Sequence, residues 1–303
     1  MSLRLTGTGV ALVTPFRKGK VDFDALSNLI EYVIKEGVDF IVSLGTTGEA
    51  VTQSAQECRE VFDATIAQVA GRVPLVAGMF GGNHTKALIQ RIRQYNFDGF
   101  DAIMSSAPSY LRPSQQGLFE HYMRVAEASP LPVIIYNVPA RTGVNVLPQT
   151  VLRLAEADPK FIAVKEAAGS VTQVMELCKY RPAHFSVLAG DDLLTLPMIA
   201  CGADGAISVI ANAFPHAFSQ MVRAAHAGRL DEAQKWNNAM LDVHPLLYEE
   251  GNPTGIKAVL ELMGTCKRTV RLPMLPASES LIGRLRQAIE KESLLRHVLQ
   301  QPV

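Results

Sequence analysis

The chain has 303 residues, of which 48% are hydrophobic, and this is enough for one large domain, or a domain with an appendage, around a buried core. Its 29 basic residues balance its 29 acidic residues, so the formal net charge is zero. No overall field favours nucleic acid or an anionic membrane surface, and a small molecule is the expected partner.

The N-terminal segment, MSLRLTGTGVALVTPF, has too short an apolar run for a signal peptide, and nothing approaches a membrane span. We therefore expect a cytoplasmic protein. The 4 cysteines lie far apart and form no CxxC pair, so we expect free structural thiols rather than disulfides or a metal site.

Short apolar runs alternate with longer amphipathic stretches from the start of the chain to about residue 226. The runs are GVALVTPF, FIVSLG, PLVAGM, DAIMSS, PVIIYN, FIAVKE, FSVLAG and GAISVI. Helix-start signals follow them, such as Ser54 and Ser114. Repeated βα units predict a parallel sheet, and eight of them predict a closed (β/α)8 TIM barrel. No GxGxxG opens a helix after the first run, which disfavours a doubly wound sheet.

Strand signals stop beyond residue 226, and helical stretches follow near 229–249, 254–263 and 279–299. We therefore predict a catalytic barrel over 1–226 and a C-terminal helical region over 227–303, packed on the barrel without a flexible linker.

The active site of such a barrel lies at the carboxyl ends of its strands. Lys165 closes the run FIAVKE, and strand alternation predicts that its side chain lies on the same side as Phe161 and Ala163. If that side is the barrel interior, burial disfavours the charged form and supplies the free amine that forms a Schiff base with a ketone. The alternative is a lysine that reaches solvent or pairs with Glu166.

Three further strand ends carry polar groups suited to a 2-keto acid. Thr46 and Thr47 lie between glycines, where a tight turn can present N–H groups and hydroxyls to a carboxylate. Tyr136 ends an apolar run and is a candidate proton relay, and Arg141 can hold a second carboxylate. The alternatives are an ordinary turn, a buried structural tyrosine and an exposed loop arginine.

Asp191 and Asp192 invite a metal hypothesis, but no complementary cluster of ligands is found at the other strand ends. Asp192 can equally cap the next helix. His84 and His121 fall in or near predicted helices without a nucleophile beside them, so we expect structural histidines. Neither a metal nor a cofactor is expected.

A set of motifs is spread over nearly the whole chain. In chain order they are GVALVTPF, GTTGEA, SYLRPSQQGLFEHY, YNVPARTG, VKEAAG, LAGDD, GADGAISVIAN and GNPTGIK. With these motifs the chain resembles the dihydrodipicolinate synthase and N-acetylneuraminate lyase family. The resemblance implies a class I aldolase-type condensation of pyruvate with L-aspartate 4-semialdehyde on the route to diaminopimelate and lysine.

The resemblance also implies roles for individual residues. Lys165 would form the imine with pyruvate, and Tyr136 would shuttle protons over it. Thr46 would connect Tyr136 to Tyr110, which the family contributes from a neighbouring subunit. The implied substrate-binding residues are Thr47, Arg141, Gly190, Ile207 and Asn252. A shared site requires at least a dimer, and the family favours a homotetramer arranged as a dimer of dimers.

Arg141 favours the synthase, because the short acidic aldehyde that a synthase uses needs a cation in its binding site. Sialic-acid lyases generally lack an arginine in the matching place. Three alternatives stay open. The chain can be a related pyruvate-dependent lyase, such as N-acetylneuraminate lyase or 2-keto-3-deoxygluconate aldolase, a non-catalytic binding protein on the same barrel, or an unrelated phosphate-binding barrel enzyme. The acidic GDD motif after the seventh run argues against the last.

The chain departs from the family pattern at APSYLRP, where synthases often have two adjacent tyrosines followed by asparagine. Ser109 replaces the first tyrosine and Leu111 the asparagine. In lysine-inhibited relatives that tyrosine, a histidine and a glutamate line the inhibitor cleft. The matching positions here are Ser109, Cys58 or Ala55, and Ala87, although Asn83 is kept. We therefore expect weak or absent lysine feedback, unless a rearranged site uses His84.

Overall fold

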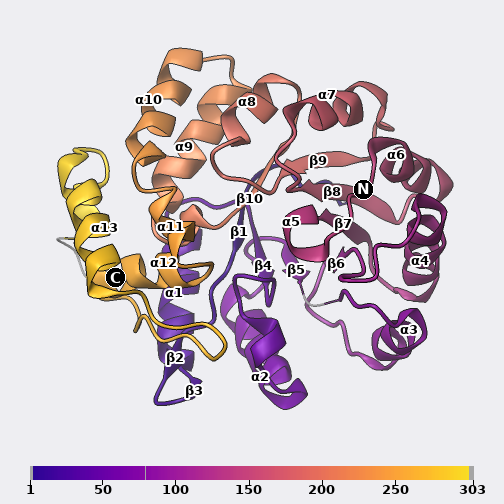
Figure 1. Ribbon diagram of the computed structural model, residues 1–303, viewed down its shortest axis with the longest axis horizontal. Coiled ribbons are helices and arrows are strands. Elements are labelled where there is room, and N and C mark those ends of the chain that lie inside the picture. Colours follow the sequence, from indigo (N-terminus) through magenta and orange to yellow (C-terminus); the bar gives the residue numbers. More distant parts are fainter. Residues whose placement is uncertain (1–2, 79, 300–303) are drawn as a thin grey trace.

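The structure, a computed structural model, describes residues 3–78 and 80–299, and within them parallel strands close into an eight-stranded barrel (Figure 1). The barrel strands are β1 (Gly7–Ala11), β4 (Phe40–Ser43), β5 (Leu75–Ala77), β6 (Ala102–Ser106), β7 (Val133–Asn137), β8 (Phe161–Glu166), β9 (Ser186–Ala189) and β10 (Gly205–Ser208). Seven of them lie within one of the apolar runs, and β1 begins two residues before GVALVTPF and overlaps it, so the predicted barrel is confirmed. The last residue of PLVAGM, Met79, lies outside the described residues.

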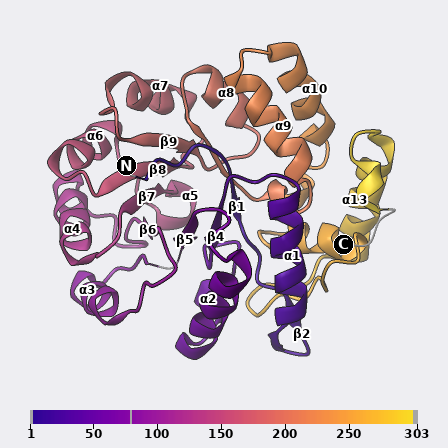
Figure 2. The ribbon, with the colours of Figure 1, turned by 180° about the vertical axis from the view of Figure 1, so that it is seen from behind.

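Helices surround the barrel and cover the outer face of its strands (Figures 1 and 2). They are α1 (Phe23–Lys35), α2 (Ala55–Val69), α3 (Thr85–Gln94), α4 (Gln115–Ala128), α6 (Pro148–Ala157), α7 (Val171–Tyr180), α8 (Thr195–Ala200) and α9 (Pro215–His226). The short helix α5 (Pro139–Thr142) instead appears inside the ring of strands in both views, and the 3₁₀ helices η1 (Ala50–Thr52) and η2 (Ile210–Asn212) follow β4 and β10. The predicted helix starts are confirmed, because Ser54 and Ser114 accept from the backbone N–H groups of Glu57 and Gly117. No helix within the described ranges is long and apolar enough to cross a membrane.

The C-terminal region is helical, as expected, but its boundaries differ from the prediction. The expected helix over 229–249 is two helices, α10 (Leu230–Leu241) and α11 (Leu246–Glu249), and Pro245 lies in the break between them. Helix α12 (Thr254–Leu262) is confirmed. The expected helix over 279–299 ends early, as α13 (Glu279–Lys291), and the 3₁₀ helix η3 (Arg296–Leu299) follows. Residues 300–303 lie outside the described residues.

A small antiparallel hairpin, which the sequence analysis did not predict, follows the first barrel strand. It pairs β2 (Phe16–Arg17) with β3 (Lys20–Val21). Lys18 and Gly19 form the turn with φ values of 51° and 78°, as a two-residue hairpin turn requires. The run GVALVTPF therefore does not continue as one strand to Phe16.

The interior of the barrel is filled by a separate apolar cluster, which includes Ile134 and Tyr136 of β7 and Ala163 of β8. Phe161 does not belong to it, so the prediction that Phe161 and Ala163 share one side is wrong. The pairing of β7 with β8 shifts register between Val133 and Ile134. This irregularity inserts one residue on β8, so Phe161 belongs to the outer core between strands and helices.

A buried ion pair ties the turn after β4 to the C-terminal region. Lys257 is fully buried, and its Nζ lies 2.5 Å from Oε1 of Glu49 and 3.0 Å from the carbonyl oxygen of Thr269. The backbone N–H of Arg271 donates to the other carboxylate oxygen of Glu49. Burial lowers the pKa of Lys257, and the charge of Glu49 opposes that shift. The GTTGE turn is therefore held from the outside by α12 and the segment after it.

Replacing Lys257 by methionine leaves Glu49 buried without its cation, so we expect Lys257→Met to lower the free energy of unfolding by about 3 kcal/mol. Chemical denaturation of the parent and the variant measures the difference. The matched control is Lys267→Met, at an exposed lysine, which should change stability by less than about 0.5 kcal/mol. Equal effects of the two substitutions would contradict a structural role for the ion pair.

Candidate active site

Lys165 and Tyr136 lie side by side at the carboxyl ends of neighbouring strands. They are partners in the register of β7 and β8, and Nζ of Lys165 is 4.7 Å from the centroid of the Tyr136 ring. Lys165 is 5% exposed and Tyr136 is 7% exposed. An amine and a phenol therefore meet inside the mouth of the barrel with little access to water.

The next pair in the same register, Asn137 and Glu166, faces away from the barrel interior. Both oxygens of the buried Glu166 carboxylate accept from Nδ2 of Asn137, at 3.0 and 3.1 Å. The backbone N–H of Ala168 and Nε2 of Gln173 donate to it as well. Burial raises the pKa of Glu166, and the hydrogen bonds oppose that shift. The alternative in which Lys165 pairs with Glu166 is therefore wrong. The Glu166 carboxylate lies on the outer side of the strands, where Asn137, Ala168 and Gln173 bind it.

Gly190, at the end of the neighbouring strand β9, leaves the space that the lysine stem occupies. A Cβ atom on Gly190 would lie 3.1 Å from Cγ of Lys165 and 2.7 Å from Cβ of Ala167. Both distances are shorter than ordinary contacts, so a side chain at this position would displace the lysine.

The GTTG turn after β4 buries one of its two threonines and leaves the other exposed. Thr47 is 2% exposed, and its Oγ1 accepts from Nδ2 of Asn252 at 3.1 Å. Thr46 is exposed. The turn itself is closed by the N–H groups of Gly48 and Glu49, which donate to the carbonyl oxygens of Gly45 and Thr46.

Arg141 and Tyr110 lie on adjoining segments of the chain. Arg141 is exposed and belongs to the short helix α5 rather than to an irregular loop. The backbone N–H of Tyr110 donates to the carbonyl oxygen of Thr142 at 2.9 Å, while the tyrosine side chain is 89% exposed. Among the described residues, no hydrogen bond joins the hydroxyl of Thr46 to Tyr136 or Tyr110.

The remaining candidate residues, Ile207 and Asp192, are both buried. Ile207 is 1% exposed inside the barrel. Asp192 does not cap the helix that follows it, α8, as the sequence analysis allowed. Its carboxylate accepts from the N–H groups of Val209 and Ile210 and so binds the start of η2. Within residues 3–78 and 80–299, no three His, Cys, Asp or Glu side chains are grouped to hold a metal.

Tyr248, which the sequence analysis did not single out, also belongs to the surroundings of the site. Burial raises its pKa, and the charges of Asp192 and Asp191 add to the shift. Tyr136 contributes in the same direction, and Arg141 opposes it. Tyr248 is therefore within electrostatic reach of both site residues. It precedes the GNPTGIK motif, and its position in the sequence carries no signal of this proximity.

Comparisons with known proteins identify the group to which this barrel belongs. The model of the dihydrodipicolinate synthetase family matches residues 4–292. A 4-hydroxy-tetrahydrodipicolinate synthase of Cytophaga hutchinsonii is 47% identical over 283 residues, which cover 93% of this chain and 95% of the relative.

Two solved structures are similar along nearly their whole length. Dihydrodipicolinate synthase from Acinetobacter baumannii, complexed with pyruvate, has a TM-score of 0.91 and 38% identity, and the match covers 95% of this chain and 99% of that one. The enzyme from Cyanidioschyzon merolae with lysine bound has a TM-score of 0.91 and 33% identity, with 96% and 99% covered. The fold, together with the family match and the named relatives, defines a (β/α)8-barrel lyase. The chain belongs to the dihydrodipicolinate synthetase family.

The carboxylate of Glu166 keeps the ends of β7 and β8 together, so we expect Glu166→Gln to destabilise the protein. The new amide would place N–H donors against the donors of Asn137 and Gln173, at a cost of about 1–3 kcal/mol. Thermal unfolding of parent and variant measures the effect. Glu290→Gln, at an exposed position of α13, is the control and should be neutral. A neutral Glu166→Gln would show that the network does not hold the strand ends.

Proposed function

We propose that the protein condenses pyruvate with L-aspartate 4-semialdehyde to give 4-hydroxy-tetrahydrodipicolinate, in the biosynthesis of diaminopimelate and lysine. The observation that carries the proposal is the buried Lys165 amine beside the Tyr136 ring, 4.7 Å from its centroid. The family and the names of its curated relatives support this choice of substrates.

In the proposed reaction, Nζ of Lys165 attacks C2 of pyruvate, and loss of one water molecule gives an imine. Loss of a proton from C3 converts the imine into an enamine, whose C3 attacks the aldehyde carbon of the semialdehyde. The nitrogen of the semialdehyde then adds to C2, closes the ring and releases the lysine amine. Tyr136 is proposed to move protons to and from the carbinolamine and the aldehyde oxygen.

The two substrates bring carboxylates to the site, and different groups are proposed to bind them. The buried turn of Thr47, whose hydroxyl is oriented by Asn252, offers a hydroxyl and N–H groups to the pyruvate carboxylate. Arg141 is proposed to bind the carboxylate of the semialdehyde, because a guanidinium can hold both of its oxygens. Gly190 is proposed to leave room for the lysine stem, and Ile207, in the apolar interior of the barrel, is proposed to bound the site. Neither a metal nor a cofactor is part of this proposal.

Replacing the nucleophile tests the proposed activity. We expect Lys165→Met to lower kcat with pyruvate and L-aspartate semialdehyde by at least about 10³-fold, whereas Lys267→Met should leave it unchanged. The assay follows the product through coupled reduction. Cleavage of N-acetylneuraminate or 2-keto-3-deoxygluconate by the parent, without turnover of the semialdehyde, would contradict the synthase proposal in favour of a related lyase.

We also propose that Tyr110 completes the site of a neighbouring subunit. Tyr110 and Leu111 are 89% and 63% exposed and adjacent in the chain, and large apolar side chains of this exposure are suited to a subunit contact. The carbonyl oxygen of Thr142 fixes the Tyr110 backbone next to Arg141. A homotetramer arranged as a dimer of dimers is the proposed assembly.

If the Tyr110 hydroxyl relays protons across the contact, Tyr110→Phe should lower kcat by about 10²-fold while the assembly stays intact. Sedimentation measures the assembly, and initial rates measure kcat. Tyr180→Phe, at another exposed tyrosine, should leave both unchanged. An active Tyr110→Phe variant, or a monomeric and fully active parent, would overturn the shared-site proposal.

Feedback by lysine is proposed to be weak. The backbone N–H and the hydroxyl of Ser109 both contact Oδ1 of Asn83, so this oxygen is engaged within the subunit. Ser109 offers no aromatic wall, and Ala87 on α3 offers no carboxylate for an amine. His84, at the N-cap of α3, is the remaining polar group of the alternative site.

Compared with a relative that has the aromatic wall and the carboxylate, we expect lysine binding to be weaker by roughly 2–5 kcal/mol. Initial rates at increasing L-lysine, with D-lysine as the control, measure the inhibition. Half-inhibition at micromolar L-lysine would contradict the proposal.

A further inference from the structure

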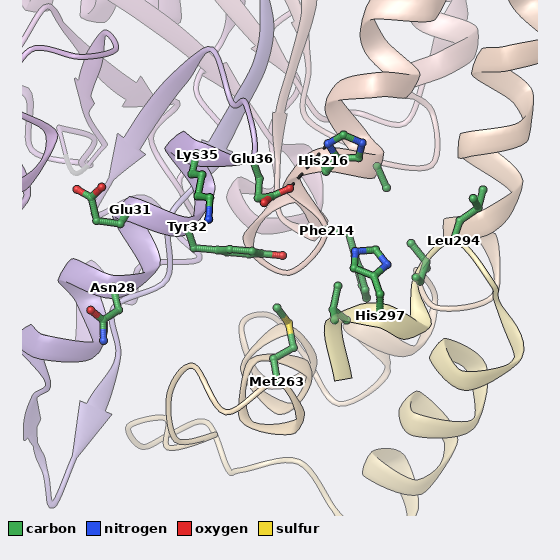
Figure 3. A pocket seen from close by; sticks show the side chains of 13 residues that line it. Asn28, Glu31, Tyr32, Lys35, Glu36, Phe214, His216, Met263, Leu294 and His297 are labelled. Carbon is green, nitrogen blue, oxygen red and sulfur yellow. Dashed lines mark ion pairs between the residues drawn. The ribbon is translucent and has the colours of Figure 1, made fainter. Parts of the chain in front are cut away.

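The C-terminal region meets the rest of the molecule on more than one side. On one side it faces α1 and the start of α9 across a cavity of about 440 Å³, whose lining includes Tyr32, Phe214 and Met263 (Figure 3). The described residues that line this cavity include none of the candidate site residues. On another side, the segment from His244 to Asn252 contacts the turns that follow β9 and β4. This second contact brings the region to the strand ends that carry the proposed site.

The segment from His244 to Asn252 lies along the mouth of the barrel. At its start, Nε2 of His244 is 4.0 Å from Oδ2 of Asp192, which follows β9. At its end, Nδ2 of Asn252 donates to Oγ1 of Thr47, which follows β4. In the closed barrel β10 and β1 lie between β9 and β4, so the segment spans the part of the rim that these strands form. Tyr248 lies midway between the two contacts.

The ring of Tyr248 is held in place by its neighbours. It packs against the ring of His244, one turn earlier, with 5.1 Å between the ring centroids and 35° between the ring planes. His244 is 6% exposed, so it is a fixed support. The backbone N–H of Gly251 donates to the carbonyl oxygen of Tyr248. Helix α12 packs on the same turn, since a Cβ atom on Gly255 would lie 2.4 Å from the carbonyl oxygen of Leu247.

The hydroxyl of Tyr248 is available to a ligand. Tyr248 is half-buried, and its hydroxyl makes no hydrogen bond with another residue in the described part of the chain. Burial raises its pKa well above the ordinary value, and the charges of Asp192 and Asp191 add to the shift, so the phenol stays neutral and able to donate. Tyr136 also raises this pKa and Arg141 lowers it, so both groups are within electrostatic reach of the phenol.

We propose that the hydroxyl of Tyr248 donates a hydrogen bond to the carboxylate of the aldehyde substrate, next to the guanidinium of Arg141, and so contributes to specificity for an acidic aldehyde. This inference rests on the proposed function, which supplies that substrate. A carboxylate that binds a guanidinium with both oxygens still has lone pairs for another donor. A phenol within reach of both Arg141 and Tyr136 can therefore help to direct the aldehyde carbon toward the enamine on Lys165.

Tyr248→Phe tests the proposal, because it removes only the hydroxyl and keeps the ring that packs against His244. Initial rates give kcat and the KM of each substrate for the parent, for Tyr248→Phe and for the matched control Tyr180→Phe, at an exposed tyrosine. Two aldehydes of the same chain length are then added as competitive inhibitors against the semialdehyde. Succinate semialdehyde has the carboxylate but no amine, and butanal has neither. Thermal unfolding checks that each variant is folded.

We expect Tyr248→Phe to raise the KM for L-aspartate semialdehyde by about tenfold, as the loss of a hydrogen bond to a charged group should. A bond to the carboxylate is present in the bound substrate and in the transition state alike, so kcat and the KM for pyruvate should stay within about twofold of the parent values. The inhibition constant of succinate semialdehyde should rise by the same factor as the KM, and that of butanal should not change. Tyr180→Phe should match the parent throughout.

An unchanged KM for the semialdehyde in a folded and active Tyr248→Phe variant would overturn this inference and leave the proposed function standing. So would an equal rise of the KM for both substrates, since that would indicate a general disturbance of the site. A higher KM for L-aspartate semialdehyde with an unchanged inhibition constant of succinate semialdehyde would show that the hydroxyl binds the amine, which also contradicts the proposal. A parent that does not turn over the semialdehyde would overturn the proposed function itself, and this inference with it.

Discussion

The closed register of the barrel is the constraint on which the rest of the molecule depends. Parallel pairing of β7 with β8 sets Tyr136 opposite Lys165 and Asn137 opposite Glu166. Because side chains alternate along a strand, the first pair faces the interior and the second faces the surrounding helices. One register therefore produces both an enclosed amine beside a phenol and a hydrogen-bonded network that holds the same strand ends together. A shift of β8 by one residue would set Val164 or Glu166 opposite Tyr136 and turn Lys165 away from the interior.

The C-terminal region stabilises this arrangement from outside the barrel. Lys257 of α12 binds Glu49 in the turn after β4, and Asn252, just before α12, donates to the hydroxyl of Thr47 in the same turn. The helical region thus holds the turn after β4 through two side chains, of which the resemblance had pointed to Asn252 but not to Lys257.

Much of the fold could be predicted from the sequence, because strands buried on both faces form continuous apolar runs and serine caps mark the starts of helices. The position of Lys165 at a strand end was predicted from the same pattern. The side on which Phe161 lies was not, because a register irregularity between neighbouring strands has no signature in one strand alone. The partner of Glu49 was not predicted either, since 208 residues separate it from Lys257. The burial of Tyr248 was not predicted for the same reason, because it depends on tertiary packing and not on the residues beside it in the sequence.

The most direct test of the central claim is the intact mass and peptide map of the protein after borohydride reduction in the presence of pyruvate. The account predicts one reduced pyruvate adduct per chain, located on the peptide that contains Lys165 and absent from Lys165→Met. An adduct on another lysine, such as the buried Lys257, or no adduct on a folded protein, would contradict the proposal that Lys165 is the imine-forming nucleophile.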